Sequence, residues 1–202
     1  MSDMPAPAAT SDSEIRLALH RRRLNRQRRQ PNTLVIDELG LAHAQSRIDI
    51  AVINGCVHGY EIKSGQDDLV RLENQLSIYR RTLQKLTIVA DTKHLQSIAD
   101  CVPEWCGIIE VERGPRGGIS FIAIRSAQFN PDVEPAMLAH LLWRPEALAL
   151  LKRHGYPAKE LRQPRKHLYK LLSETLTPRE ITAAIREFMP RRQAWKDRLV
   201  RA

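Results

Sequence analysis

Three features are scarce in this 202-residue sequence: cysteine, long apolar runs and glycine-rich loops. Cys56, Cys101 and Cys106 are too few and too unevenly spaced for a disulfide framework, and even with His94 nearby they lack the ligand spacing of a structural zinc site. No apolar run approaches the ~20 residues that span a bilayer. Glycine-rich phosphate loops and Ser/His/Asp arrangements are also missing. We therefore expect reduced thiols and no membrane partner.

The first residues carry no secretory signal. Residues 1–14 are rich in Ala, Pro, Ser and acidic residues, and they lack the basic-then-apolar order of such a signal. We expect residues 1–11 to form a disordered leader and the protein to be cytoplasmic.

Charge is distributed unevenly along the chain. Residues 1–31 hold seven basic and three acidic residues (+4), residues 32–135 ten and fourteen (−4), and residues 136–202 fifteen and six (+9), which agrees with the total of +9. Basic clusters usually indicate a polyanionic partner. For the last segment alone, solvated helix faces are an almost equally good explanation.

Apolar periodicity and turn residues predict an α/β part, residues 12–130, followed by a basic helical module, residues 136–202. Asn54-Gly55 indicates a hairpin, and residues 130–135 resemble a linker. The expected strands are 33–39, 47–53, 57–64, 87–90, 106–111 and 119–124. The expected helices are 12–30 (ended by Pro31), one capped by Asp67 or Asp68 and reaching Leu83, 93–100, 136–154, 164–174 and 177–189.

The hairpin loop decides how acidic residues are placed. A two-residue loop would put Asp49 opposite Tyr60, whereas a three-residue loop, residues 54–56, puts Asp49 opposite Glu61 and Arg47 opposite Lys63. The second register is preferred because it gathers Ile48, Ile50, Val52, Tyr60 and Ile62 on one face that helices can cover.

Two carboxylates on opposed strand positions have Cβ atoms ~5 Å apart and repel each other unless a cation lies between them. Asp49 and Glu61 therefore form a candidate site for Mg²⁺, which takes one or two carboxylates and keeps several waters. Lys63 lies on the same face and could orient or deprotonate a water. The alternative is a surface patch in which Lys63 neutralises the acids.

The pattern Asp49, eleven residues, then Glu61-Ile62-Lys63 resembles the signature of the PD-(D/E)XK nuclease superfamily. The resemblance covers roughly residues 33–111. It implies an α/β fold with a restriction-endonuclease-like α-β-β-β-α-β core and, here, a C-terminal helical module. It further implies that Asp49, Glu61 and the Ile62 carbonyl bind the metal, and that Lys63 assists the attacking water.

Other residues take roles from the same resemblance. Glu38 is the candidate for a further metal-binding acid, although it lies in a strand-like run rather than in the first helix. Gln75 and Tyr79 resemble a QxxxY motif that holds substrate, but Tyr79 also fits an apolar helix stripe. Arg47 and Arg71 are candidates for nucleic-acid binding. Asp67 fits a helix cap better than a ligand.

The function expected from the resemblance is a Mg²⁺- or Mn²⁺-dependent nuclease acting on nucleic acid, with DNA favoured over RNA by family analogy alone. One alternative is a nuclease fold that binds nucleic acid without cutting it. Another is a protein-interaction module. A homodimer is also open, because apolar residues of the basic module offer a packing surface: Leu138, Leu141, Leu142, Trp143, Leu148 and Leu151.

Overall fold

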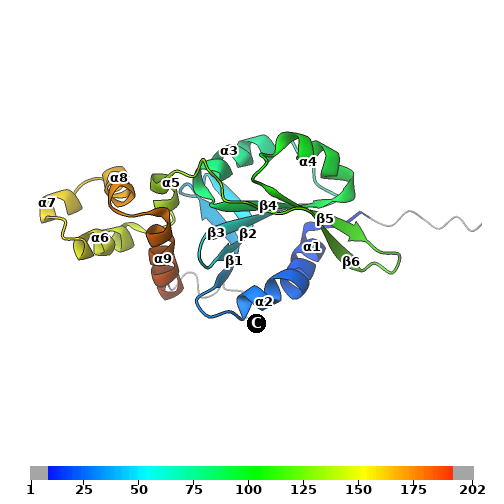
Figure 1. The fold of residues 1–202 in the computed structure, drawn as a ribbon, viewed down its shortest axis with the longest axis horizontal. Coiled ribbons are helices and arrows are strands. Elements are labelled where there is room, and N and C mark those ends of the chain that lie inside the picture. The colour runs from blue at the N-terminus through cyan, green and yellow to red at the C-terminus, as the bar shows by residue number, and fades with distance from the viewer. Residues whose placement is uncertain (1–8, 193–202) are drawn as a thin grey trace, which may run out of the picture.

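The structure, a computed structural model, describes residues 9–192, which form a mixed six-stranded sheet with helices on both faces (Figure 1). The strands lie in sequence order across the sheet. β1, β2 and β3 pair antiparallel, β3–β4 and β4–β5 pair parallel, and β5–β6 is an antiparallel hairpin. The six expected strands are thus confirmed: β1 (Leu34–Leu41), β2 (Ser46–Ile53), β3 (Val57–Lys63), β4 (Lys85–Asp91), β5 (Gly107–Arg113) and β6 (Ile119–Arg125).

One face of the sheet is covered by the first helical segment. It comprises α1 (Asp12–Leu19), a π-helical stretch (His20–Leu24) and α2 (Asn25–Arg28), and it ends before Pro31 as expected. The start is set by Ser11, whose backbone N–H and hydroxyl both donate to the Glu14 carboxylate. Apolar side chains of this segment pack on the sheet in one cluster: Ile15, Leu19, Leu24, Val35, Ile50, Val52, Tyr60, Ile62, Val89, Val111 and Ile119.

The opposite face is covered by α3 (Leu72–Thr82) and α4 (Leu95–Cys101). α3 begins at Leu72, so the expected cap at Asp67 or Asp68 is wrong. Asp67 instead accepts hydrogen bonds from the backbone N–H and the hydroxyl of Ser64, each at 2.7 Å. These local bonds hold the chain after β3 in a turn, so the helix begins only at Leu72.

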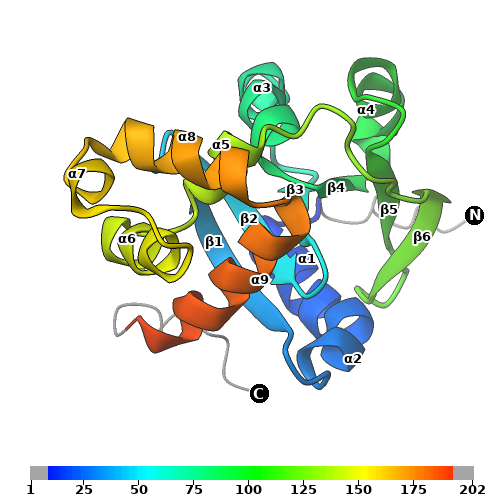
Figure 2. The ribbon, with the colours of Figure 1, turned by 60° about the vertical axis from the view of Figure 1, so that its left-hand side comes forward.

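The C-terminal helices lie beside the β1 edge of the sheet (Figure 2). The expected single helix over residues 136–154 is wrong, because the chain turns after Ala139 and Pro145 lies in the first turn of a new helix. Thr177 caps the last helix as expected and accepts a hydrogen bond from the Glu180 N–H. The helices are α5 (Pro135–Ala139), α6 (Arg144–Arg153), α7 (Ala158–Leu161), α8 (Arg165–Thr175) and α9 (Pro178–Phe188).

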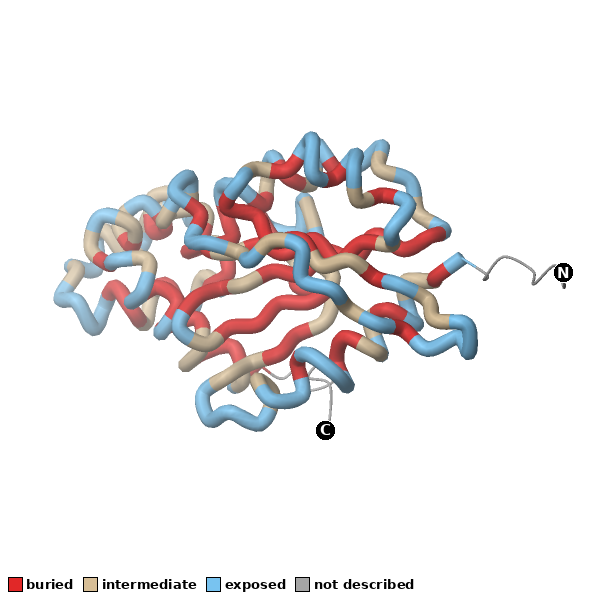
Figure 3. The backbone as a smooth tube through the Cα atoms, turned by 45° about the vertical axis from the view of Figure 1, so that its right-hand side comes forward, coloured by how far each residue is buried: buried red, intermediate tan, exposed pale blue. Residues whose placement is uncertain are grey.

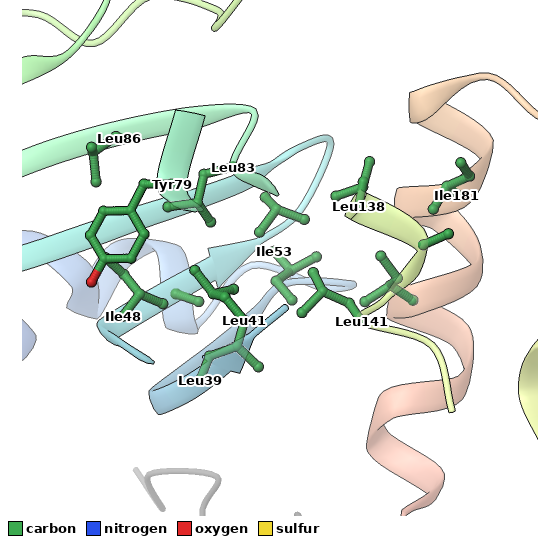
Figure 4. Packing of buried hydrophobic residues seen from close by; sticks show 14 of the residues in the cluster. Leu39, Leu41, Ile48, Ile53, Tyr79, Leu83, Leu86, Leu138, Leu141 and Ile181 are labelled. Carbon is green, nitrogen blue, oxygen red and sulfur yellow. The ribbon is translucent and has the colours of Figure 1, made fainter. Parts of the chain in front are cut away.

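The helical module and the sheet share one hydrophobic core. Figure 4 shows Leu138 and Leu141 between Ile53 of the sheet and Ile181 of α9. The buried Gln84 side chain accepts from the Thr182 hydroxyl at 2.7 Å and from the Val57 N–H at 2.8 Å. The leucines that could have formed a dimer face are therefore largely used within the chain: Leu138, Leu141, Leu142 and Leu151 are buried, and Leu148 is partly buried.

Burial is concentrated along the strands, whereas the outward helix surfaces are exposed (Figure 3). Thr10 falls within the expected leader over residues 1–11, yet it is buried, and its hydroxyl donates to Asp91 at 2.5 Å and accepts from the Gly65 N–H at 2.8 Å. Residues 1–8 and 193–202 lie outside the described residues. Among residues 9–192, no helix combines the length and apolarity needed to cross a membrane.

Candidate active site

A cleft of about 710 Å³ lies at one end of β2 and β3, between α1 and α3. It brings together almost every site residue expected from the sequence, and Tyr79 reaches the same place through its contact with Glu61. In the sequence these residues are spread over more than forty positions. The lining residues are Asp12, Arg16, Glu38, Ala44, Gln45, Ser46, Arg47, Asp49, Glu61, Ile62, Lys63, Asp67, Arg71, Asn74, Gln75 and Ile78.

The hairpin between β2 and β3 has the expected three-residue loop. Ile53 pairs with Val57 and Ile50 pairs with Tyr60, so Asp49 does not face Tyr60. The recorded ladder ends at the Ile50–Tyr60 pair. The expected direct pairs Asp49–Glu61 and Arg47–Lys63 are therefore not formed as ladder pairs, and a side-chain contact of Asp49 takes their place.

The β1–β2 ladder is also interrupted at Asp49. The ladder omits Glu38 and Asp49, yet the pairs on both sides keep the same register. Glu38 has a left-handed φ of 56°, which is uncommon outside glycine. The alternation of side chains changes here: Ile50 packs in the cluster beneath α1, whereas Ile48 packs in the cluster beneath α3. The expectation that Ile48 and Ile50 share a face is therefore wrong.

Asp49 is anchored at this interruption. Its Oδ2 accepts the Ile62 backbone N–H at 2.7 Å. Burial and the charge of Glu61 raise the pKa of Asp49 to about 7, while the Ile62 N–H and Arg16 oppose that rise. The charges of Asp49 and Glu61 are therefore close enough to interact, although the two residues do not form the direct pair that was expected.

Glu61 is only 2 % exposed, and three donors surround its carboxylate. Lys63 Nζ donates to Oε1 at 2.8 Å, Gln75 Nε2 donates to Oε1 at 2.7 Å, and the Tyr79 hydroxyl donates to Oε2 at 2.7 Å. Burial and the charge of Glu61 raise the pKa of Tyr79, so its phenol stays protonated and remains a donor. A buried carboxylate is tolerated only when its oxygens are satisfied in this way.

Gln75 and Tyr79 owe their positions to α3, where residues four apart lie on one face. Gln75 Oε1 also accepts from Lys63 Nζ at 2.9 Å, so one amide connects Glu61 with Lys63. Tyr79 is fully buried, so the apolar-stripe interpretation and the polar contact both hold for it. The hydroxyl is the part that the stripe does not explain.

Sequence reasoning missed Arg16 of α1. Its guanidinium donates to the Asp49 carbonyl at 2.6 Å and to Asp49 Oδ1 at 3.0 Å, and it pairs with Glu38 at 2.7 Å and with Asp12 at 3.1 Å. The one sequence signal was the i, i+4 spacing from Asp12, which is also common on solvated helix faces. Arg16 therefore neutralises part of the negative charge in the cleft.

The remaining candidates lie at the mouth of the cleft. Glu38 is half-exposed and has a second contact with Arg47 at 3.5 Å. Arg47 and Arg71 are exposed, which leaves their guanidinium groups accessible to a ligand in solution.

The donor set at the base of the cleft consists of hard oxygens. Asp49, Glu61 and the Ile62 carbonyl are ligand types that Mg²⁺ and Mn²⁺ accept. Within residues 9–192, however, no group of three His, Cys, Asp or Glu side chains is arranged to hold a metal ion. A cation here would need the carbonyl or waters to complete its coordination.

Comparison with known proteins gives a family. A family profile described as Bacteriophage P4 protein cII matches residues 9–202. The chain belongs to this family. Protein cII of Enterobacteria phage P4 is 28% identical to it over 121 residues, covering 60% of this chain and 46% of that relative. The matched part thus spans about half the length of the phage P4 protein, and no solved structure matches.

Proposed function

We propose that this chain is a divalent-metal-dependent nuclease and that Asp49, Glu61 and Lys63 form its active site. The observation that carries the proposal is that these three residues line one cleft. Further support comes from the order α1-β1-β2-β3-α3-β4, with antiparallel, antiparallel and parallel pairing. That order agrees with the α-β-β-β-α-β core of PD-(D/E)XK nucleases.

The oxygen ligands of the site fit a hard cation, and the negative charge of the two carboxylates also favours a bound cation. Asp49 has its pKa raised to about 7 by burial and by the charge of Glu61, so a positive charge between the two acids would relieve their repulsion. Asp49, Glu61 and the Ile62 carbonyl would hold Mg²⁺ or Mn²⁺. When bound, such an ion polarises a phosphoryl oxygen and lowers the pKa of a coordinated water.

Side chains around the proposed metal site would position the attacking water and the phosphate. Lys63 uses two of its three ammonium donors on Glu61 and Gln75, and the third can hydrogen-bond a water or a phosphate oxygen. This donor arrangement favours orienting the attacking water over removing its proton. Gln75 and Tyr79 position Glu61, and Arg47 and Arg71 contact the phosphate backbone. DNA is preferred over RNA by family analogy alone.

A specific observation favours a second candidate, a nuclease fold that binds nucleic acid without cutting it. Arg16 occupies the neighbourhood of Asp49 and Glu38 as an internal cation. If it stays there, it satisfies Asp49 without a metal ion, and the cleft would bind phosphate only through its arginines.

One experiment separates the two candidates. Plasmid DNA, single-stranded DNA and RNA are incubated with the protein in Mg²⁺, in Mn²⁺ and in EDTA. Cleavage that requires the metal supports the nuclease, and binding without cleavage under all conditions supports the second candidate. Cleavage that persists in EDTA would refute the metal-dependent assignment.

A further inference from the structure

A second cavity, of about 550 Å³, lies between the β1–β2 turn and the helices α6 and α8. Figure 2 shows these helices next to β1. We call it the helical pocket, and no Asp or Glu is among its lining residues. They are Leu39, Gly40, His43, Ala44, His140, Leu141, Leu142, Trp143, Arg144, Pro145, Arg165, Tyr169, Met189 and Arg192.

Two cations of this pocket are available to a ligand. Arg165 is exposed and makes no hydrogen bond or ion pair within residues 9–192. Arg144 makes one weak contact, to the Gln163 carbonyl at 3.4 Å. Burial lowers the pKa of His43 and His140, with the charge of Arg165 contributing to both shifts. The lining thus offers the guanidinium groups of Arg144 and Arg165 to a ligand, and its two imidazoles are neutral at neutral pH.

The pocket also presents aromatic surface. Trp143 is 45 % exposed, although it is large and apolar. Arg192 lies 4.6 Å from its ring centroid, but this guanidinium is buried and pairs with Glu146, so the cations available to a ligand near the ring are Arg144 and Arg165. His43 stacks on His140 with ring centroids 4.3 Å apart, and Tyr169 lies 4.8 Å from His140. Cations beside exposed aromatic rings are the combination with which proteins bind single-stranded nucleic acid.

The turn between β1 and β2 connects the helical pocket with the cleft. Ala42, His43 and Ala44 have φ values of 48°, 57° and 66°, which are left-handed conformations that non-glycine residues rarely adopt in succession. Such strain persists where surrounding contacts impose it, often at functional sites. The turn holds His43 against His140, and Ala44 lines both the cleft and the pocket.

We propose that the helical pocket binds a single-stranded segment of nucleic acid. Arg144 and Arg165 contact its phosphates, Trp143 stacks on an unpaired base, and the strand continues past Ala44 into the cleft. This inference rests on the proposed function, which supplies nucleic acid as the ligand and the cleft as the place to which the strand leads. A duplex offers its phosphates but no free base face to Trp143, so a single strand fits the pocket better.

The test is binding without cleavage. A fluorescein-labelled 12-nucleotide single-stranded DNA and a duplex of the same length are titrated in EDTA at two salt concentrations. The proteins are the wild type, Arg165→Gln, Arg144→Gln and Trp143→Leu. Arg179→Gln is the matched control, because it removes one exposed positive charge from α9 outside the pocket. Circular dichroism is used to check that each variant is folded. If Trp143→Leu does not fold, the two arginine variants alone provide the test.

Arg165→Gln and Arg144→Gln are each expected to weaken single-strand binding roughly tenfold and to reduce the slope of log K against log salt by about 0.7, the value for one lost phosphate contact. Trp143→Leu is expected to weaken it roughly 5- to 100-fold with the slope unchanged. Arg179→Gln should bind like the wild type. Equal losses in all four variants, or tighter binding of the duplex than of the single strand, would overturn the proposal. Because this experiment measures binding, and the metal-dependence experiment measures cleavage, failure of this site is distinguishable from failure of the proposed nuclease.

Discussion

The Asp49 carboxylate accepts the backbone N–H of Ile62 at 2.7 Å. In this bond the Asp49 side chain of β2 accepts the backbone N–H of β3 that a backbone carbonyl would accept in a regular ladder. The bond holds Asp49 next to Glu61 and to the residue whose carbonyl completes the proposed donor set. The bond is made at the interruption of the β1–β2 ladder, which omits both Glu38 and Asp49.

Replacing Asp49 tests the donor set. We expect Asp49→Asn to lose Mn²⁺ binding in calorimetry and to abolish cleavage, because a neutral amide is a poor ligand for a hard cation. The fold should survive, since the amide oxygen can still accept the Ile62 N–H. Asp12→Asn is the control, because Asp12 lines the same cleft and pairs with Arg16 but has no proposed ligand role. Unaltered Mn²⁺ affinity in Asp49→Asn would contradict the assignment.

The raised pKa of Asp49 predicts a pH dependence of stability in EDTA. Its pKa is about 7 in the folded protein and ~3.9 in an unfolded chain. The folded state therefore binds an extra proton between these values, and a contribution of at most ~4 kcal/mol is present below pH ~4 and lost as the pH rises through 7. His58 and His140, whose pKa values burial lowers to about 4, act in the opposite direction.

The effect of Asp49 is isolated by comparing thermal unfolding of the wild type and Asp49→Asn. The Tm of the variant minus that of the wild type should increase from pH 4.5 to 7.5. A difference that stays constant over this range would mean that Asp49 has an ordinary pKa in the folded protein.

The Tyr79 hydroxyl is expected to stabilise the fold by holding Glu61. Tyr79→Phe removes a donor to a buried carboxylate and should lower the free energy of unfolding by about 1.5–3 kcal/mol in urea titration. Tyr156→Phe is the control, because its hydroxyl bonds the neutral Thr175 hydroxyl at 2.6 Å and should cost only about 0.5–1.5 kcal/mol. Equal losses in both variants would argue against a special role for the Glu61 contact.

Lys63 should separate binding from catalysis. We expect Lys63→Ala to bind Mn²⁺ nearly as well as the wild type and to cleave ~10²–10⁴-fold more slowly, because a group that positions water is lost. Lys166→Ala, an exposed lysine of α8, controls for the loss of charge. Full cleavage activity in Lys63→Ala would exclude Lys63 from the active site.

A chain that ends at Asp132 is expected not to fold cooperatively. It loses the leucines that cover the β1 edge of the sheet and the Thr182 partner of buried Gln84. Circular dichroism and urea unfolding of this truncation check the expectation. A stable, cooperative transition would mean that the helical part is an independent module after all.

Much of the fold could be predicted from local pattern. The six strands, the helix that ends before Pro31, the cap at Thr177 and the three-residue loop after Ile53 follow from side-chain period, proline and turn chemistry, which act within a few residues. The break in the helix after Ala139 and the late start of α3 were not predicted, although their causes are local: Pro145 lies in the first turn of a new helix, and Asp67 bonds Ser64 three residues away.

Local pattern was enough to place Glu61 and Lys63 on one face of β3, because side chains alternate along a strand with a period of two. Three features could not be predicted locally: Asp49 leaves the ladder, Arg16 reaches it from α1, and the basic helices share the core of the sheet. Those outcomes depend on contacts between residues from 13 to 98 positions apart. Packing between distant segments sets burial and charge at such contacts, and a local sequence pattern carries no information about that packing.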